Sequence, residues 1–215
     1  MARFFGRLGF SPNALTVIGF GIALIAAWLA TLEMWFVAGL VVAFGAVFDL
    51  FDGALARATD RTSRFGAFLD STLDRAGEAV VYIGIAFGAL LSNYEPVALL
   101  AAAAMTAAFM VSYTRAKAES LDFTEYGGLG SVGLAPREVR TVILVISLLL
   151  SGEGHLQLVP PPGQVCIDLC TNAGAIALSI GLGLIAILAT VTAIQRIYFV
   201  YQQSKSEPNT EKENH

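Results

Sequence analysis

Long apolar runs separated by short polar segments dominate the hydrophobicity pattern of this chain. A helix needs roughly 20 apolar residues to cross the hydrocarbon core of a bilayer, and six stretches meet or approach that length. They span residues 14–32, 35–56, 65–91, 96–116, 138–150 and 173–201. The fifth is the shortest. The pattern predicts an all-α, polytopic membrane protein with six transmembrane helices.

The basic residues fall on one side of this predicted topology. All 13 Lys and Arg lie in segments that six spans bring to the side of the two termini, or in helix ends that adjoin them. The opposite side receives Glu33, the turn 92–95 and the segment 151–172, which contain no Lys or Arg. Basic residues are retained in the cytoplasm, and an odd number of spans would destroy the segregation. We therefore expect a cell (plasma) membrane protein with both termini cytoplasmic.

The two ends of the chain differ from the spans. Residues 1–10 are amphipathic and precede Pro12, which indicates a short helix on the membrane surface. Residues 204–215 are polar, with three Glu and two Lys, as in disordered tails. We expect one transmembrane domain over residues 1–203, followed by this tail.

Composition supports a membrane protein. The chain is 56% hydrophobic and 14% charged, with a mean hydropathy of +0.68, whereas about a quarter of the residues in soluble domains are charged. A soluble helical protein would need polar helix faces that this sequence lacks. The net charge of −4 argues against a nucleic-acid partner. Cys166 and Cys170 have no second pair that would complete a zinc site.

Four aspartates stand at helical spacing where the second and third predicted spans meet the cytoplasmic side. Positions three and four apart share a helix face, and the short connection 58–65 makes the two helices antiparallel neighbours. The two faces can therefore meet, so that the carboxylates converge. These faces comprise Asp49, Asp52, Gly53, Ala56 and Arg57 in the second span and Gly66, Asp70 and Asp74 in the third.

A cluster of four carboxylates in a membrane needs neutralising charge. Each Asp costs about 2.5–3.5 kcal/mol at the centre of a span and less toward its ends, and mutual repulsion adds to this cost. One arginine does not balance four carboxylates, whereas Mg²⁺ or Mn²⁺ prefers oxygen ligands of this kind. Paired divalent ions are a recurring device in phosphoryl transfer. The cluster therefore predicts bound divalent metal ions, of the kind used in pairs for phosphoryl transfer.

Two alternatives bear on this interpretation. Gly53, Ala56 and Gly66 can leave a groove for a phosphate-bearing ligand, but small residues also mediate ordinary helix packing in membranes. A cation transporter also places aspartates between helices. It more often places them at mid-membrane on broken helices, whereas these crowd toward one face beside Arg57.

The spacing of these residues resembles the signature of the CDP-alcohol phosphotransferase family. The pattern D-x2-D-G-x2-A-R-x8-G-x3-D-x3-D is filled at every fixed position from Asp49 to Asp74. The similarity extends to residues 11–16, to the six-helix plan and to Gln195 and Arg196. It implies transfer of a phosphatidyl group from a CDP-linked lipid, CDP-diacylglycerol or an archaeal equivalent, to an alcohol with release of CMP. It also implies a homodimer.

The same resemblance assigns roles to residues. It makes Asp74 the base that takes the proton of the acceptor hydroxyl. The implied metal ligands are Asp49, Asp52, Asp70 and Asp74. The implied CDP-lipid site is formed by Asn13, Asp52, Gly53, Ala56, Arg57 and Gly66.

Basic residues at the cytoplasmic helix ends suggest the class of acceptor. An arginine as deep in a span as Arg196 is rare and usually faces a cavity, and several guanidinium groups suit an acceptor that carries a phosphate. The alternative is that such residues are anchors whose side chains snorkel to the surface, which we expect for Lys117, Arg140 and Lys205. The expected acceptor site is formed by Ser112, Arg115, Arg137 and Arg196.

The segment 112–119, with residues 136–138 and Arg196, is similar to prokaryotic phosphatidylinositol-phosphate synthases, whose acceptor is inositol 1-phosphate. Arg115 departs from the lysine that this branch often has there. The phosphatidylglycerophosphate synthases, which use glycerol 3-phosphate, are the alternative. Their lysine-rich stretch after the fourth helix is absent from this sequence.

Overall fold

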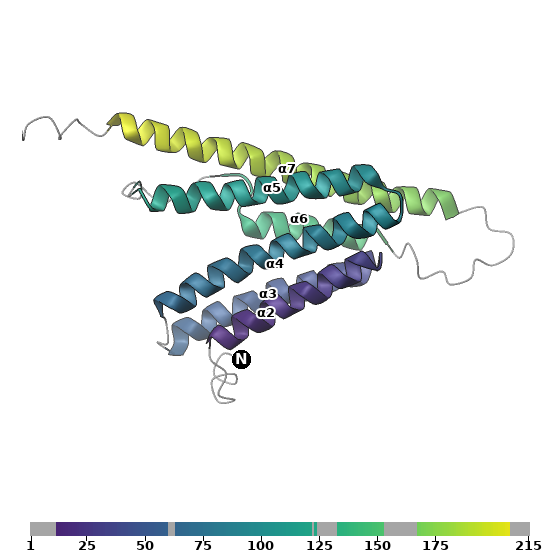
Figure 1. Cartoon of the computed structure of the whole chain (residues 1–215), viewed down its shortest axis with the longest axis horizontal. Coiled ribbons are helices and arrows are strands. Elements are labelled where there is room, and N and C mark those ends of the chain that lie inside the picture. Colours follow the sequence, from purple (N-terminus) through teal and green to yellow (C-terminus); the bar gives the residue numbers. More distant parts are fainter. Residues whose placement is uncertain (1–11, 60–62, 122, 124–132, 153–166, 207–215) are drawn as a thin grey trace, which may run out of the picture.

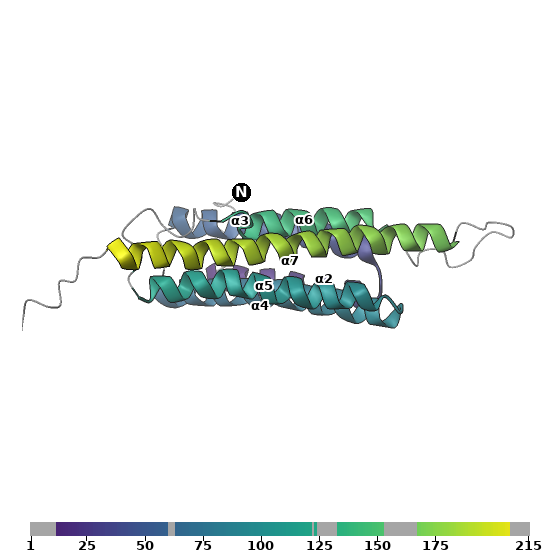
Figure 2. The ribbon, with the colours of Figure 1, turned by 90° about the horizontal axis from the view of Figure 1, so that it is seen from above.

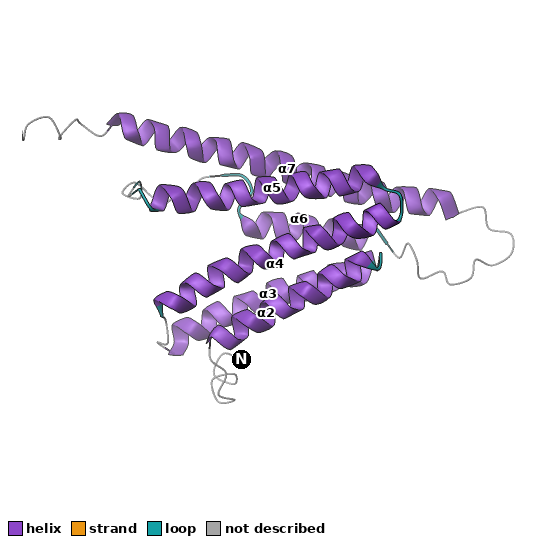
Figure 3. Cartoon of the chain, in the orientation of Figure 1, coloured by secondary structure: helices purple, strands orange, loops and turns teal. Residues whose placement is uncertain are grey.

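The computed structural model describes residues 12–59, 63–121, 123, 133–152 and 167–206, and every regular element in these ranges is a helix (Figures 1 and 3). The predicted all-α class is therefore confirmed. The six helices in this part are α2 (Pro12–Thr31), α3 (Trp35–Thr59), α4 (Arg64–Leu91), α5 (Glu95–Glu119), α6 (Arg137–Leu150) and α7 (Ile167–Ser206).

Each of the six apolar stretches of the sequence coincides with one helix. Helix α7 continues to Ser206, two residues beyond the predicted start of the polar tail at 204. The predicted surface helix in residues 1–10 and the rest of the tail lie outside the described residues. Within the described residues, three helices are long and apolar enough to cross a membrane, over Asn13–Thr31, Glu95–Glu119 and Gly174–Lys205. Together with the exposed apolar faces described below, they make this a membrane protein.

The helices pack in a closed ring. Helix α2 packs against α3 and α4, helix α5 packs against α4 and α7, and helix α6 packs against α3 and α7. Figure 2 shows the same arrangement from above, with the long α7 lying between α5 and α6. Helices α4 and α6 therefore face each other across the ring instead of packing closely side by side.

Glycines bring α4 into direct contact with α2. A Cβ atom on Gly84 would collide with the backbone of Ala27, and one on Gly88 would collide with the carbonyl oxygen of Ala30. Close backbone approach at small residues is typical of helix pairs in membranes. These two glycines, one turn apart, therefore fix the separation of α2 and α4.

Apolar side chains both fill the ring and cover its outside. Tyr82 and Ile85 of α4 are buried in the centre. Large apolar side chains such as Trp28, Leu99 and Ile180 are exposed on the outer faces. So much apolar surface on the outside of a bundle is expected in contact with lipid and would drive association in water.

Candidate active site

A cavity of about 440 Å³ lies inside the ring between α2, α3, α4 and α6. Its lining changes along α4, from the carboxylates of Asp70 and Asp74 through Glu78 to Val81 and Tyr82. These residues are four or fewer positions apart in sequence. Because an α-helix rises about 1.5 Å per residue, they follow one another along the axis of α4. The cavity is therefore acidic toward the first turns of α4 and apolar further along it.

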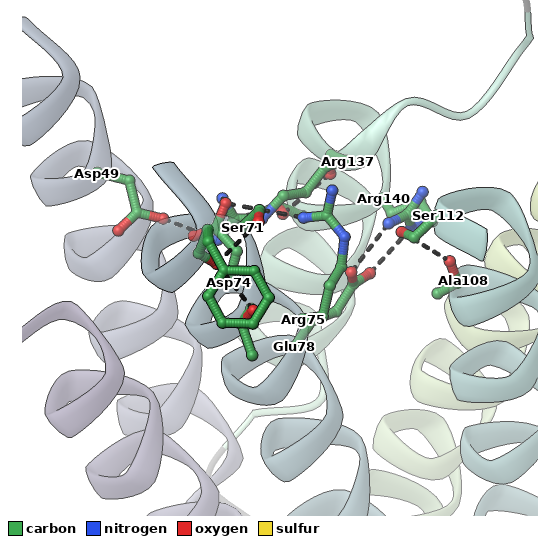
Figure 4. A network of polar contacts seen from close by, with 12 residues as sticks. Asp49, Ser71, Asp74, Arg75, Glu78, Ala108, Ser112, Arg137 and Arg140 are labelled. Carbon is green, nitrogen blue, oxygen red and sulfur yellow. Dashed lines mark hydrogen bonds and ion pairs between the residues drawn. The ribbon is translucent and has the colours of Figure 1, made fainter. Parts of the chain in front are cut away.

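Carboxylates from two helices meet in this cavity. Asp49 is contributed by α3, and Asp70 and Asp74 are contributed by α4. Arg137, the first residue of α6, bridges two of them. Its Nη2 donates to Asp49 Oδ2 at 2.8 Å and its Nη1 to Asp74 Oδ2 at 2.6 Å (Figure 4). Asp49 and Asp74 are thus close enough to share one guanidinium. The expectation that α3 and α4 are packed neighbours is wrong for the described residues, because α2 packs against both of them and they do not pack closely against each other.

Gly19 leaves space beside Asp49, and Arg75 adds positive charge beside Asp74. A Cβ atom on Gly19 of α2 would lie 3.2 Å from Asp49 Oδ1, so a glycine at this position keeps the carboxylate accessible. Arg75 Nη1 lies 3.7 Å from Asp74 Oδ2. Asp74 therefore has basic groups on two sides, and the stronger contact is the shorter one to Arg137.

A second ion pair lies beside the first. Arg140 of α6 donates from Nε and Nη2 to the two carboxylate oxygens of Glu78 on α4, both at 2.9 Å (Figure 4). Its Nη1 donates to the carbonyl oxygen of Ala135 at 3.0 Å. The Arg140 side chain is only 1% exposed. The expectation that Arg140 snorkels to the surface is therefore wrong, because a carboxylate inside the ring supplies the partner that water would supply outside.

The start of α4 meets the start of α2. Ser63 caps α4, and its Oγ accepts from the Gly66 N–H at 2.9 Å. A Cβ atom on Gly66 would lie 3.0 Å from Asn13 Oδ1. Two residues of the predicted CDP-lipid site, Asn13 and Gly66, are thus adjacent although 53 positions apart in sequence. The other predicted members lie in α3, but the side chains of Asp52, Gly53, Ala56 and Arg57 fall outside the described residues.

The predicted acceptor residues divide into two groups. Arg137 lines the cavity, whereas Ser112, Arg115 and Arg196 are not among the described residues that line it. Ser112 donates to the Ala108 carbonyl at 3.3 Å, as Figure 4 shows.

The two outlying arginines differ in exposure. Arg115 is exposed and its Nε lies 2.7 Å from Glu119 Oε1. Arg196 is 4% exposed, and its Nη1 donates to the Val111 carbonyl at 2.6 Å. Burial of Arg196 agrees with its position deep in the last span.

The donor chemistry of the cavity fits a hard divalent cation. Carboxylate oxygens are the ligands that Mg²⁺ and Mn²⁺ prefer, and a guanidinium already occupies the point where Asp49 and Asp74 approach each other. Among the described side chains, which exclude that of Asp52, no three acidic groups converge closely enough to form a complete ligand set. Asp49, Asp70 and Asp74 therefore have the donor chemistry that suits a divalent ion, but do not by themselves form a complete ligand set among the described residues.

Comparison with known proteins decides the family. The model of CDP-alcohol phosphatidyltransferase matches residues 10–192. The chain belongs to this family. The resemblance of the aspartate signature is therefore confirmed, and the protein is an enzyme of phospholipid biosynthesis.

This phosphatidyltransferase is similar over most of its length to two synthases of inositol phosphate lipids. It is 37% identical over 191 residues to the archaetidylinositol phosphate synthase of Pyrococcus horikoshii, covering 89% of this chain and 84% of that protein. It is 30% identical over 204 residues to the phosphatidylinositol phosphate synthase of Mycobacterium tuberculosis, covering 94% and 84%.

Solved structures of the Mycobacterium tuberculosis enzyme share the fold of this phosphatidyltransferase. The crystal structure with CDP-DAG bound has a TM-score of 0.75 at 28% identity, over 93% of this chain and 91% of that one. The complex of the same enzyme with manganese and citrate also gives a TM-score of 0.75, over 93% and 87%.

Sequence reasoning did not identify Glu78 as part of the phosphatidyltransferase site. The signal was available, because Glu78 continues at a spacing of four the row formed by Gly66, Asp70 and Asp74. An acidic residue four positions beyond the signature, on the same face of the same helix, predicts a basic partner inside the bundle. Arg140 is that partner.

Proposed function

We propose that this enzyme transfers the phosphatidyl-type group of a CDP-linked lipid to inositol 1-phosphate, releasing CMP and forming a phosphatidylinositol phosphate. The observation that carries the proposal is the meeting of Asp49, Asp74 and Arg137 in one cavity. It combines acidic groups suited to metal-assisted phosphoryl transfer with a guanidinium suited to phosphate. The relatives' names supply the acceptor, since both are synthases of an inositol phosphate lipid.

Metal binding is assigned to Asp49, Asp52, Asp70 and Asp74, with two Mg²⁺ or Mn²⁺ ions. Bound there, the ions would offset phosphate charge and polarise the reacting phosphorus centre. Manganese in the related structure supports a divalent ion. Asp74 takes the proton from the acceptor hydroxyl as that oxygen attacks the β-phosphorus of the donor, and CMP leaves.

The donor lies along the signature faces of α3 and α4. Asn13 and Gly66 adjoin each other and are assigned to the cytidine diphosphate, and Gly53, Ala56 and Arg57 of α3 are assigned to the same groove. The apolar lining that continues along α4 to Val81 suits the first carbons of the lipid chains. CDP-DAG in the related structure supports a donor of this class.

The acceptor phosphate is bound by basic groups on the remaining helices. Arg137 stands at the carboxylates, and Ser112, Arg115 and Arg196 are assigned to the side of the site formed by α5 and α7. Arg115 and Arg196 lie near enough to each other for their charges to interact. A doubly charged phosphate would relieve this repulsion.

All six helices cross the plasma membrane in this proposal, with both termini and the active site on the cytoplasmic side. Helices α3, α4 and α6 carry exposed apolar residues such as Phe44, Ile83 and Leu150. These residues support a membrane crossing by each of the three helices, in addition to the crossings by α2, α5 and α7. The segregation of Lys and Arg supports the orientation. The transmembrane domain covers residues 1–203 with a polar tail over 204–215, and the protein acts as a homodimer.

An acceptor panel tests the function. Purified enzyme receives radiolabelled CDP-diacylglycerol or its archaeal ether analogue, with inositol 1-phosphate, inositol, glycerol 3-phosphate or serine. We expect a phosphatidylinositol-phosphate-type product and CMP with inositol 1-phosphate, loss of both with a chelator, and recovery with Mg²⁺ or Mn²⁺. Preference for glycerol 3-phosphate would replace the acceptor, and divalent-ion uptake by vesicles without CMP release would indicate a transporter.

A further inference from the structure

Arg137 does not hold its position by its own contacts alone. It is the first residue of α6, and the segment that precedes it, from Gly133 to Pro136, has no regular structure. A long side chain at a helix start can adopt many rotamers. Its placement across Asp49 and Asp74 therefore requires that the backbone of this segment be fixed.

The peptide of Ala135 is fixed on both sides. Its N–H donates to Thr192 Oγ1 of α7 at 3.0 Å, and its carbonyl oxygen accepts from Arg140 Nη1 at 3.0 Å. Ala135 and Thr192 are both completely buried. The Thr192 hydroxyl also donates to the Leu188 carbonyl at 2.8 Å, so its orientation is set by α7.

Glu78 in turn fixes Arg140. The bidentate contact between a guanidinium and a carboxylate is the most directional ion pair available to side chains. Here it connects α4 to α6 across the ring, where the two helices do not pack closely. The Glu78 side chain is 12% exposed, so little water competes for the contact.

The backbone just before this peptide packs tightly against Thr192. Gly133 has φ of +129°, and a Cβ atom at this position would collide with the Thr192 side chain. The chain thus passes directly over Thr192 two residues before Ala135. Helices α4 and α7 hold the entry to α6 from opposite sides.

We infer that three residues inside the ring hold Arg137 over the carboxylates through the peptide of Ala135. They are Glu78, Arg140 and Thr192. They are positioning residues, because none contacts the carboxylates of Asp49 or Asp74. The inference rests on the proposed function in one respect: Arg137 must contribute to turnover for its positioning to be measurable by activity.

A double-mutant cycle with Arg137 separates positioning from general stability. Thr192→Val removes the acceptor hydroxyl and keeps the side-chain shape, so the fold survives. Thr190→Val is the matched control, because the Thr190 hydroxyl donates to the Ala186 carbonyl on an exposed face of the same helix. Each is made alone and with Arg137→Gln, and kcat and KM are measured for both substrates.

We expect Thr192→Val to lower kcat/KM for the acceptor about tenfold to a hundredfold, as loss of supporting contacts behind metal-site residues typically does. In the Arg137→Gln background the same change should lower it no more than about twofold, because residues that act through one another are not additive. Equal effects in both backgrounds would overturn the inference. Glu78→Gln, combined with Arg137→Gln in the same way, gives a second cycle from the opposite side.

Hydrogen exchange gives a readout that is independent of activity. The amide of Ala135 should exchange at least about tenfold faster in Thr192→Val than in the wild type or Thr190→Val, since its acceptor is lost. Unchanged exchange would overturn the inference. If inositol 1-phosphate is not the acceptor, the cycle is run with the one that the panel identifies. If no transfer occurs at all, the proposed function fails and the exchange rate still decides whether the peptide is held.

Discussion

Arg137 and Arg140 lie one turn apart on α6 and pair with carboxylates one turn apart on α4, yet their surroundings differ. The Arg137 side chain is 31% exposed to the cavity, and it is shared between Asp49 and Asp74. The Arg140 side chain is 1% exposed and is closed by Glu78 and the Ala135 carbonyl. An open pair can exchange its partner for a ligand, whereas a closed pair cannot contact a ligand and can act only by holding other groups in place.

A pair that can contact ligands and a pair that supports the fold therefore lie within a few residues of each other. Loss of a group at the open pair should reduce turnover and leave the fold intact. Loss of a group at the closed pair should destabilise the protein, because a buried charge without its partner is expensive. The following changes test whether the two pairs divide in this way.

Asp74→Asn should have the largest effect. It removes the proposed base and a metal ligand but keeps the size of the side chain, so kcat should fall about 100- to 10,000-fold. CDP-lipid binding should stay measurable in an equilibrium assay, with little change in the melting temperature. Retained turnover would exclude Asp74 as the base.

Glu78→Gln should have the largest effect on stability. It leaves the Arg140 charge buried without a counter-charge, which costs about 3–5 kcal/mol, measured as loss of the folded fraction during denaturation in detergent. The double variant Glu78→Gln with Arg140→Gln should recover most of this loss, because neither charge remains. Glu95→Gln, at an exposed position in the first turn of α5, is the control and should change nothing.

Arg137→Gln should affect substrates unequally. A charged hydrogen bond contributes about 1.5–3 kcal/mol, so KM for the phosphorylated acceptor should rise about tenfold to a hundredfold. The melting temperature and KM for the CDP-lipid should change much less. Arg196→Ala, at the other end of the proposed acceptor site, should show the same selectivity. Equal increases in both KM values would place these arginines outside the acceptor site.

Gly133→Ala should have the smallest effect. It places a side chain at a left-handed φ and against Thr192, which should destabilise the entry to α6 by about 1–3 kcal/mol. Gly152→Ala is the matched control, because Gly152 also has a positive φ but has open space around its Cβ position. If the two variants behave alike, strain alone acts and contact with Thr192 contributes nothing.

The sequence predicts the helices well, because they depend on local periodicity, and it places Asp49, Asp70 and Asp74 in one cavity. Asp49 and Asp74 both contact the Arg137 guanidinium, although among the described residues α3 and α4 lie on either side of α2 and are not the close neighbours that their short connection predicted. Arg137 could be named as a candidate, but its pairing with carboxylates 63 and 88 positions away depends on where α6 enters the ring. No local pattern contains that information.

The misjudged residue was Arg140. From the sequence it could point to either the membrane surface or the ring interior, and nothing within one turn on its own helix decides between them. Glu78 decides, and it lies 62 positions away. In this bundle the buried charges on one helix are interpretable only together with those on the helix that it faces.

The position of manganese in a crystal of this enzyme tests the central claim most directly. Anomalous scattering at the manganese edge locates the ion without reference to activity. The account predicts manganese between α3 and α4, coordinated by carboxylate oxygens that include those of Asp49, Asp70 and Asp74, with the signal lost in an Asp70→Asn crystal. Manganese bound elsewhere, or an equal signal in that variant, would contradict the account.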